Sequence, residues 1–196
     1  MNPVNPNKVL INRENFFQLV RLSGLFGKMT QSQVDTIDSI FNEWERRQLK
    51  DKRWLAYMLG TVYHETTMNM RAVEEYGKGY GHDYGKKLKR SRVPYSTPDK
   101  LYYGRGLVQI TWYENYESFG RLLGIDLLNK PELALDTDIA VKIMYIGMIN
   151  GDFTGRGLPH FFSSTNEDWI NAREIINGED CAEKIARYGK LFFKCL

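Results

Sequence analysis

Two acidic sites in the sequence have a spacing suited to acid–base chemistry, Glu65 and the adjacent pair Glu74-Glu75. In a helix that starts near Asp51, Glu65 follows Met58 by seven residues, about two turns, and therefore lies on the apolar side. Burial disfavours an ionised carboxylate and raises its pKa, and a carboxylic acid that keeps its proton near neutral pH can act as a general acid. The structural alternative is a helix-end glutamate that reaches solvent or pairs with an arginine.

A second carboxylate can share a substrate with Glu65 only if the chain turns between them. In one continuous helix, Glu74 would lie on the opposite side and about 13 Å further along the axis. The intervening residues 66–69, TTMN, continue a helix poorly, so the sequence predicts a turn there. A turn would let Glu74 or Glu75 face Glu65 across a groove, and two carboxylates that flank one bond can hydrolyse a glycoside. Exposed loop charge is the alternative interpretation of the two adjacent glutamates.

The segment YYGRGLVQITWYENY at 102–116 has the groups that a sugar site requires. Gln109, Thr111 and Asn115 offer directional hydrogen bonds to hydroxyl and acetamido groups. Tyr103 and its aromatic neighbours offer flat apolar faces on which a pyranose ring can lie. A plain hairpin packed on a helix would have a similar composition, so the segment alone leaves both interpretations open.

Helices must position these residues, because helical periodicity dominates the sequence. Capping signals predict helices that begin after Asn12, after Thr30 with Gln33 as its capping-box partner, and after Asp51. Further helices are expected at 112–123, 138–149, 167–176 and 180–194, with Asp136 or Thr137 capping the second of these and Thr165 or Asn166 the third. β-like residues occur only around 101–111. The sequence therefore predicts a mainly α fold with a small β element.

Length and composition favour one globular domain. The chain has 196 residues, of which 42% are hydrophobic and 26% charged, which suits a single core or one domain split into two lobes. No apolar run approaches the roughly 20 residues that span a membrane, so no stable membrane insertion is expected. Residues 1–17 lack a basic start followed by an apolar stretch, so we expect synthesis in the cytoplasm without a signal peptide and a separate route of release.

Charge and cysteine content argue against several other classes of function. The net charge of +3 does not specify a nucleic-acid binder, and the basic run at 78–92 is either a solvated loop or a patch that attracts a polyanion such as an anionic cell envelope. That run lacks aromatic interleaving on a recognisable nucleic-acid fold, so no nucleic-acid partner is expected. Cys181 and Cys195 on one predicted helix would be roughly 21 Å apart, too far for a disulfide. The three histidines form no ligand cluster, so neither a metal nor a cofactor is expected.

Four motifs occur in an order that resembles one enzyme family. HET at 64–66 and GRGLVQIT at 104–111 are followed by NKPELALDTDIAVKIMYIGM at 129–148 and REIINGEDCAEKIARYGKLF at 173–192. The set resembles the chitinase class of family 19 glycoside hydrolases over roughly residues 50–196. Within that family it is similar to the phage-type endolysins, which cut peptidoglycan. The resemblance implies a lysozyme-like helical fold with a central substrate cleft.

The resemblance also implies a role for each candidate residue. Glu65 would be the general acid and Glu74, in the sequence VEE, the base that activates water, while Glu75 is the less favoured choice of base. The sugar would be positioned by Gln109, Thr111 and Asn115 and contacted by Asn177, in addition to the flat face that Tyr103 offers. This chain departs from the family pattern with TM at 67–68, where many members have a glycine pair, and with EKI at 183–185, where many have DRI.

The residues and the resemblance together predict a glycoside hydrolase that cleaves β-1,4 links of N-acetylated aminosugars in bacterial peptidoglycan, with inversion. Inversion requires a carboxyl separation of roughly 6.5–9.5 Å. We expect one two-lobed catalytic domain over 1–196, a monomer, in which helices of 1–49 pack on the core of 50–196 and a basic loop occupies about 76–100. Its partners would be peptidoglycan glycan strands, reached at the cell wall after release. The alternatives are a chitinase acting on chitin and a non-catalytic wall-binding module.

Overall fold

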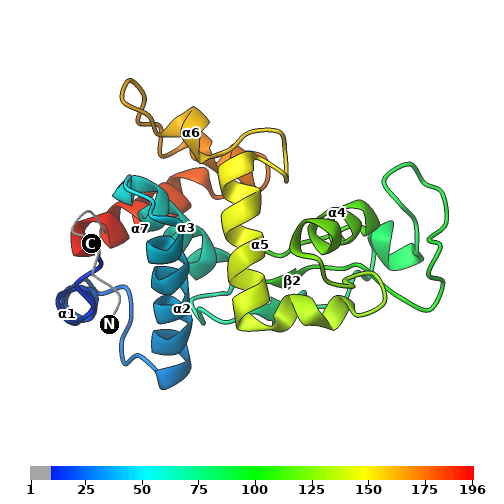
Figure 1. The fold of residues 1–196 in the computed structure, drawn as a ribbon, viewed down its shortest axis with the longest axis horizontal. Coiled ribbons are helices and arrows are strands. Elements are labelled where there is room, and N and C mark those ends of the chain that lie inside the picture. The colour runs from blue at the N-terminus through cyan, green and yellow to red at the C-terminus, as the bar shows by residue number, and fades with distance from the viewer. Residues whose placement is uncertain (1–9) are drawn as a thin grey trace, which may run out of the picture. The chain divides into compact units, whose positions relative to one another are not determined.

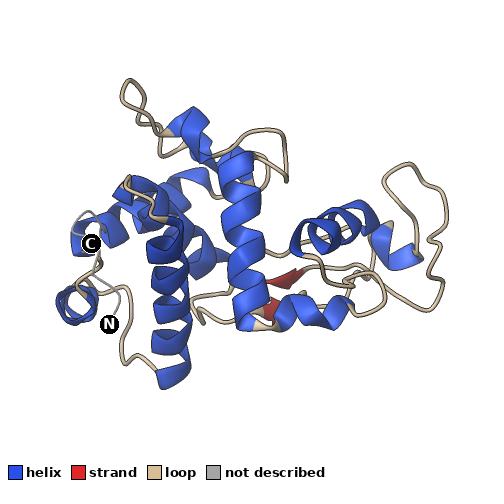
Figure 2. Cartoon of the chain, in the orientation of Figure 1, coloured by secondary structure: helices blue, strands red, loops and turns tan. Residues whose placement is uncertain are grey.

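The computed structural model describes residues 10–196 and shows a mainly helical protein (Figures 1 and 2). Residues 1–9, on which the expectation of an absent signal peptide partly rests, lie outside the described part. The α-helices are α1 (Arg13–Leu22), α2 (Gln31–Arg47), α3 (Lys52–Glu65), α4 (Tyr113–Leu123), α5 (Thr137–Asn150), α6 (Leu158–Phe161) and α7 (Ala182–Cys195), and the short 3-10 helices are η1 (Tyr84–Lys86), η2 (Pro131–Leu135) and η3 (Asn171–Ile175). The predicted fold class is confirmed. No helix within residues 10–196 is long and apolar enough to cross a membrane.

The elements form two compact units. Unit 1 contains the described residues up to Met70 together with Tyr145–Leu196, and unit 2 contains Arg71–Met144. Unit 2 is therefore inserted into the sequence of unit 1, and α5 begins in unit 2 and ends in unit 1. Buried apolar side chains occur in both units, so each has a core of its own.

The starts of the helices are fixed by the side chains that the sequence predicts. Asn12 caps α1, Thr30 and Gln33 form a reciprocal capping box at α2, and Asp51 caps α3. Asp136 caps α5, where its side chain accepts a hydrogen bond from a backbone N–H of the first turn. Each cap satisfies backbone groups that the first helical turn leaves without a partner, so polar residues just outside each helix determine where it begins.

The core of unit 1 is built around α3, which is buried on every side through most of its length. α7 packs along α3 (Figure 1), and the two backbones touch at glycines. A Cβ atom on Gly60 would lie 2.6 Å from the backbone nitrogen of Gly189, an approach that only glycine permits. Near this contact, the Tyr63 ring meets those of Phe26 and Tyr188 edge-on, with centroids 5.0 and 4.8 Å away. The helix that ends at Glu65 is therefore held firmly along its length.

The sheet of unit 2 has two very short strands (Figure 2). β1 (Val73–Glu74) pairs antiparallel with β2 (Arg105–Gly106), so that Glu74 lies opposite Arg105. β2 falls within the segment that the sequence identifies as β-like, whereas β1 is too short to show an alternating pattern. Tyrosine rings with centroids 4.8–5.7 Å apart form a core cluster in this unit, made of Tyr95, Tyr102, Tyr113 and Tyr116.

The helix expected at 167–176 is wrong in its extent and in its cap. Only η3 is helical there, and neither Thr165 nor Asn166 begins a helix. Asp168 organises a turn instead, since its carboxylate accepts hydrogen bonds from the backbone and side-chain nitrogens of Asn171. The other three later helices are present within two residues of their predicted ends, as α4, α5 and α7. Both cysteines are free.

Candidate active site

Glu65 is the last residue of α3, and the helix stops immediately after it. Thr66 ends the helix, because its hydroxyl donates to the carbonyl of Val62 at 2.7 Å and accepts from the backbone N–H of Met70 at 2.8 Å. The hydroxyl adds to the backbone bond that the Val62 carbonyl already accepts from the Thr66 N–H at 3.0 Å, and it gives the Met70 N–H an acceptor beyond the helix end. The turn predicted for residues 66–69 is therefore present.

The turn holds several residues in a conformation that costs them energy. Thr67, Met68 and Met70 have φ angles of +50°, +66° and +51°. This left-handed region costs an L-residue roughly 1–2 kcal/mol, and a β-branched threonine is especially rare there. The departure from the family pattern at 67–68 thus falls where glycine would be relaxed. Backbone strain of this kind concentrates at functional sites, where surrounding structure enforces it.

Glu65 forms a buried ion pair within unit 1. Its Oε1 accepts a hydrogen bond from Nη1 of Arg173 at 2.6 Å, and the two side chains are 15% and 5% exposed. Nε of Arg173 also donates to the carbonyl of Asp180 at 2.9 Å, which fixes the guanidinium. The arginine pairing that the sequence leaves open as the structural alternative is therefore present.

Arg173 is a site residue that sequence reasoning misses. It stands in REIING, four residues before Asn177, and nothing in its type or spacing sets it apart from other arginines. Only the fold brings it to Glu65, from which 108 positions separate it in the chain.

Glu74 lies in unit 2 at the end of β1, surrounded by hydrogen-bond donors. Its Oε1 accepts from the hydroxyl of Tyr103 at 2.6 Å, and its Oε2 lies 3.1 Å from Nζ of Lys78. The hydrogen bond from Tyr103, together with Lys78, holds the pKa of Glu74 below its ordinary value of 4.5. The side chain is 33% exposed, so it is ionised near neutral pH and open to water. These are the properties that a general base needs.

Arg105 is buried next to Glu74 and Tyr103. The residue is 5% exposed, and its Cζ lies 3.6 Å from the centre of the Tyr103 ring. Its Nη1 donates to the carbonyl of Leu101 and to the hydroxyl of Tyr116, both at 3.0 Å, and Tyr116 donates in turn to the carbonyl of Tyr103 at 2.8 Å. Nε of Arg105 lies 3.6 Å from Oε1 of Glu74. A buried positive charge thus sits next to the carboxylate, and sequence reasoning identifies Arg105 only as part of a motif.

Glu75 is engaged differently from its neighbour. Its Oε2 accepts from the backbone N–H of Gly104 at 2.8 Å, and the hydroxyl of Tyr84 lies 3.0 and 3.2 Å from its two oxygens. The side chain is 20% exposed, less than that of Glu74. These contacts tie Glu75 into the framework of unit 2, whereas Glu74 keeps more of its carboxylate open to solvent.

Gln109 bridges the two strands. Its Nε2 donates to the carbonyls of Val73 at 3.0 Å and Gly106 at 3.1 Å. A Cβ atom on Gly104 would lie 2.8 Å from Oε1 of Gln109, so the Gln109 side chain packs directly against this glycine. Because backbone carbonyls of both strands accept from its amide nitrogen, Gln109 holds β1, the strand that carries Glu74, against β2.

The remaining predicted sugar-binding residues divide between the units. Thr111 is half-buried just before α4, and Asn115 is 8% exposed in its first turn, both in unit 2. Asn177 is exposed in unit 1, where its Oδ1 accepts from the backbone N–H of Gly178 at 2.9 Å. The structure thus gathers Tyr103 and Gln109 around the strand of Glu74. Within residues 10–196, no three His, Cys, Asp or Glu side chains lie together in a way that could hold a metal ion.

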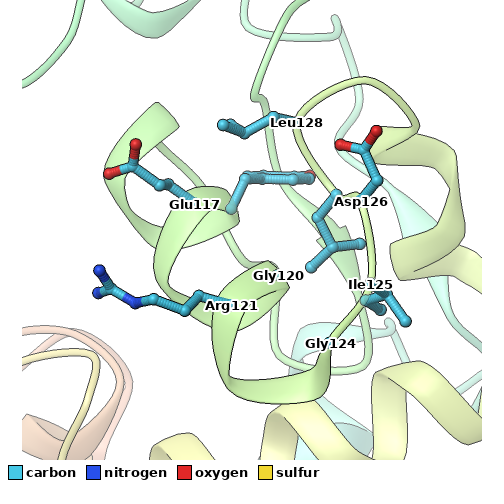
Figure 3. A pocket seen from close by; sticks show the side chains of 9 residues that line it. Glu117, Gly120, Arg121, Gly124, Ile125, Asp126 and Leu128 are labelled. Atoms are coloured by element: carbon cyan, nitrogen blue, oxygen red, sulfur yellow. The ribbon is translucent and has the colours of Figure 1, made fainter.

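Unit 2 also has a cavity of about 290 Å3 between α4 and the loop that follows it (Figure 3). In this view Glu117 and Arg121 extend from the helix, while Asp126 and Leu128 come from the loop. Asp126 is already bound to the backbone and side-chain nitrogens of a nearby asparagine at 3.0 and 2.8 Å. Tyr116, which accepts a hydrogen bond from Arg105, lines the cavity, but none of the predicted site residues does.

Comparison with known proteins identifies sequence relatives. The sequence model of a family described as chitinase class I, glycoside hydrolase family 19, matches residues 44–151. An endochitinase of Phaseolus vulgaris is 38% identical over 98 residues, which cover 46% of this chain and 30% of the relative. A protein of Hevea brasiliensis named inactive chitinase-like protein 1 is 35% identical over 99 residues, covering 46% of this chain and 32% of the relative. The chain thus spans about a third of the length of these relatives.

Solved chitinase structures share the fold. Chitinase C of Streptomyces griseus superimposes with a TM-score of 0.64 at 24% identity, over 98% of this chain and 95% of that chain. A class IV chitinase of Zea mays gives a TM-score of 0.53 at 20% identity, over 99% of this chain and 86% of that chain. At these identities the likeness concerns the fold alone, and it confirms the predicted chitinase-class helical fold.

Proposed function

The chain belongs to glycoside hydrolase family 19, the chitinase class I family, and on that premise we propose that it hydrolyses β-1,4 links between N-acetylated aminosugars in chitin-type glycans. The observation that carries the proposal is the environment of Glu74. This carboxylate is kept ionised by Tyr103 and Lys78 and remains open to water, which suits it to take a proton from an attacking water molecule.

The proposed mechanism assigns one proton transfer to each carboxylate. Glu74 removes a proton from water as the water oxygen attacks the anomeric carbon, and Glu65 gives its proton to the leaving glycosidic oxygen, with inversion. Glu65 must therefore be protonated at the moment of cleavage.

The surrounding residues position these two groups. Arg173 holds the Glu65 carboxylate in one place, and Tyr103 orients Glu74. In the proposal the sugar is contacted by Thr111, Asn115 and Asn177, with Gln109 keeping β1 in register. Glu75 is assigned a structural role, because the Gly104 N–H and the Tyr84 hydroxyl already use its oxygens.

Three matched variants test the assignment. Release of reducing ends from chitin oligosaccharides is measured for Glu65→Gln, Glu74→Gln and Glu75→Gln. The first two should lower kcat by about 10²–10⁴-fold, the size of a lost general acid or base. Glu75→Gln is the control and should stay within about tenfold of the parent, since it deletes a charge one residue from the base. The proposal fails if the parent releases no reducing ends. The choice of base fails if Glu75→Gln is the inactive variant.

Peptidoglycan is the second candidate substrate, and the spacing of the two glutamates favours it. Glu74 follows Glu65 by nine residues in the context VEE, which is the feature that resembles phage-type endolysins. Chitin stands first because the relatives and structures above are named chitinases. Mass spectrometry of digested sacculi, set beside the chitin assay, separates the two, since it reports which bond is cut. One relative is named inactive, so a non-catalytic wall-binding module is also tested by this assay: release of products excludes it, and binding without release supports it.

A further inference from the structure

Two tyrosines directly after Glu74 have fully exposed side chains. Tyr76 is 103% exposed and Tyr80 is 91% exposed, the highest values among the large apolar side chains of residues 10–196. Other tyrosines of unit 2, such as Tyr84, Tyr95 and Tyr102, are less than a tenth exposed. A single exposed aromatic side chain is ordinary, but exposed aromatic side chains close together in one loop can mark a ligand-binding surface.

The loop that carries them has a defined backbone. Successive turns are closed by hydrogen bonds from the N–H of Lys78 to the carbonyl of Glu75 at 3.1 Å and from the N–H of Tyr80 to the carbonyl of Gly77 at 2.9 Å. Gly79 is buried, and a Cβ atom there would lie 3.2 Å from the ring of Tyr84. The two tyrosines are therefore carried by a loop whose backbone is already ordered, so binding a ligand there requires little further ordering of the backbone.

The loop is also fastened to the candidate base. Lys78, midway between the tyrosines, forms an ion pair with Glu74 at 3.1 Å. Glu75, at the start of the loop, is anchored by the backbone of Gly104 and the hydroxyl of Tyr84. The positive charge of the loop is thus turned toward Glu74, and what it offers to an incoming partner is two aromatic side chains.

We propose that Tyr76 and Tyr80 form a glycan-stacking platform, on which pyranose rings of the strand that reaches Glu74 lie against the tyrosine faces. A neutral N-acetylated glycan matches this surface, because aminosugar rings have apolar faces and the cation between the tyrosines is already paired. The inference rests on the proposed function for the identity of the ligand. It goes further in assigning a specific subsite, and hence a preference for long chains, to two residues that no motif identifies.

The test is binding to insoluble chitin by the full chain carrying Glu65→Gln, so that the polymer is not consumed. In this background Tyr76→Ala and Tyr80→Ala should each weaken binding by about three- to tenfold, the range expected for one lost aromatic stack. Tyr76→Phe and Tyr80→Phe keep the ring and should bind as the parent does. Phe193→Ala removes an exposed aromatic side chain from unit 1 and serves as the matched control, with no change expected.

Kinetics of the active chain give a second measurement. The alanine variants should raise KM on long chitin oligosaccharides, leave kcat unchanged, and leave both constants unchanged on the shortest substrates. The platform is refuted if the alanine variants bind as the parent does, if the phenylalanine variants lose as much as the alanine variants, or if Phe193→Ala loses as much. A parent that binds chitin through these tyrosines but releases no reducing ends would overturn the proposed function and leave the platform standing. If the parent hydrolyses chitin and the alanine variants behave as the parent does, the platform is refuted and the proposed function stands.

Discussion

Replacing Tyr103 with phenylalanine removes one hydrogen bond and little else. The hydroxyl donates to Oε1 of Glu74 at 2.6 Å, while the ring that stacks under Arg105 remains. A hydrogen bond to a charged group contributes roughly 1.5–3 kcal/mol, and partial exposure reduces this value because water takes over part of the interaction. With 33% of the Glu74 side chain exposed, we expect a loss of about 1 kcal/mol, which raises the pKa of Glu74 toward its ordinary value.

The direction of the effect on activity follows from the proposed role of Glu74 as the base. The acid limb of the kcat/KM profile reports ionisation of the free enzyme's base, so Tyr103→Phe should move that limb to higher pH. The same change should appear in stability. A carboxyl group whose pKa is lowered by folding stabilises the folded state above its unfolded pKa, and that contribution is lost as pH falls through the folded pKa. Tyr103→Phe should therefore be destabilised by about 1 kcal/mol at pH 7 and by less and less as the pH falls through the folded-state pKa of Glu74.

Tyr102→Phe is the matched control. The Tyr102 hydroxyl bonds to Thr97 and to the carbonyl of Leu128, away from Glu74, so this variant should lose stability without moving the acid limb. The assays are initial rates on chitin oligosaccharides between about pH 3 and pH 8, and urea unfolding at the two ends of that range. An acid limb that stays in place, or moves to lower pH, in Tyr103→Phe would show that this hydrogen bond does not set the ionisation of the base.

Three further predictions concern the packing around Glu65 and α3. Arg173→Met should lower the free energy of unfolding in urea by about 3 kcal/mol, because it leaves the Glu65 carboxylate buried without its partner. The double variant with Glu65→Gln should recover most of that loss, and no recovery would contradict the buried pair. Thr67→Gly relieves a φ of +50° and should raise Tm by about 2–4 °C, so a lower Tm would show that the turn is not strained. Gly60→Ala should destabilise by about 2 kcal/mol or more because its Cβ meets the backbone of α7, whereas Gly27→Ala, with open space around it, should stay within about 0.5 kcal/mol; equal effects would refute the close contact.

Local signals allowed much of the helical framework to be predicted from the sequence. Asn12, Thr30 and Asp51 mark helix starts because a cap acts on the backbone within three residues of itself. The poor helix formers after Glu65 likewise place the end of α3 correctly. Thr165 fails as a cap because Asp168 competes for the same stretch with a tighter turn, a choice that propensity alone does not resolve.

The candidate site was only partly predictable, because its contacts join residues that are distant in sequence. Periodicity places Glu65 on the buried side of α3, but the arginine that meets it comes from η3. The motif around residue 105 attracts attention to Tyr103, yet its hydrogen bond to Glu74 depends on the pairing of β1 with β2. Strands of two residues are too short to show an alternating pattern, so they can be identified only from the three-dimensional structure.

The insertion of unit 2 between the two sequence segments of unit 1 affects how the protein is made. Ribosomes add roughly 5–20 residues per second, so the 108 positions between Glu65 and Arg173 correspond to about 5–20 s of translation. During that interval α3 has emerged but α7 has not, and the glycine contact that seats α3 against its partner is unavailable. Residues 71–144 can all fold before the second segment of unit 1 has been synthesised. The nascent chain therefore carries an uncovered apolar helix, and the ion pair of Glu65 is among the last contacts to form.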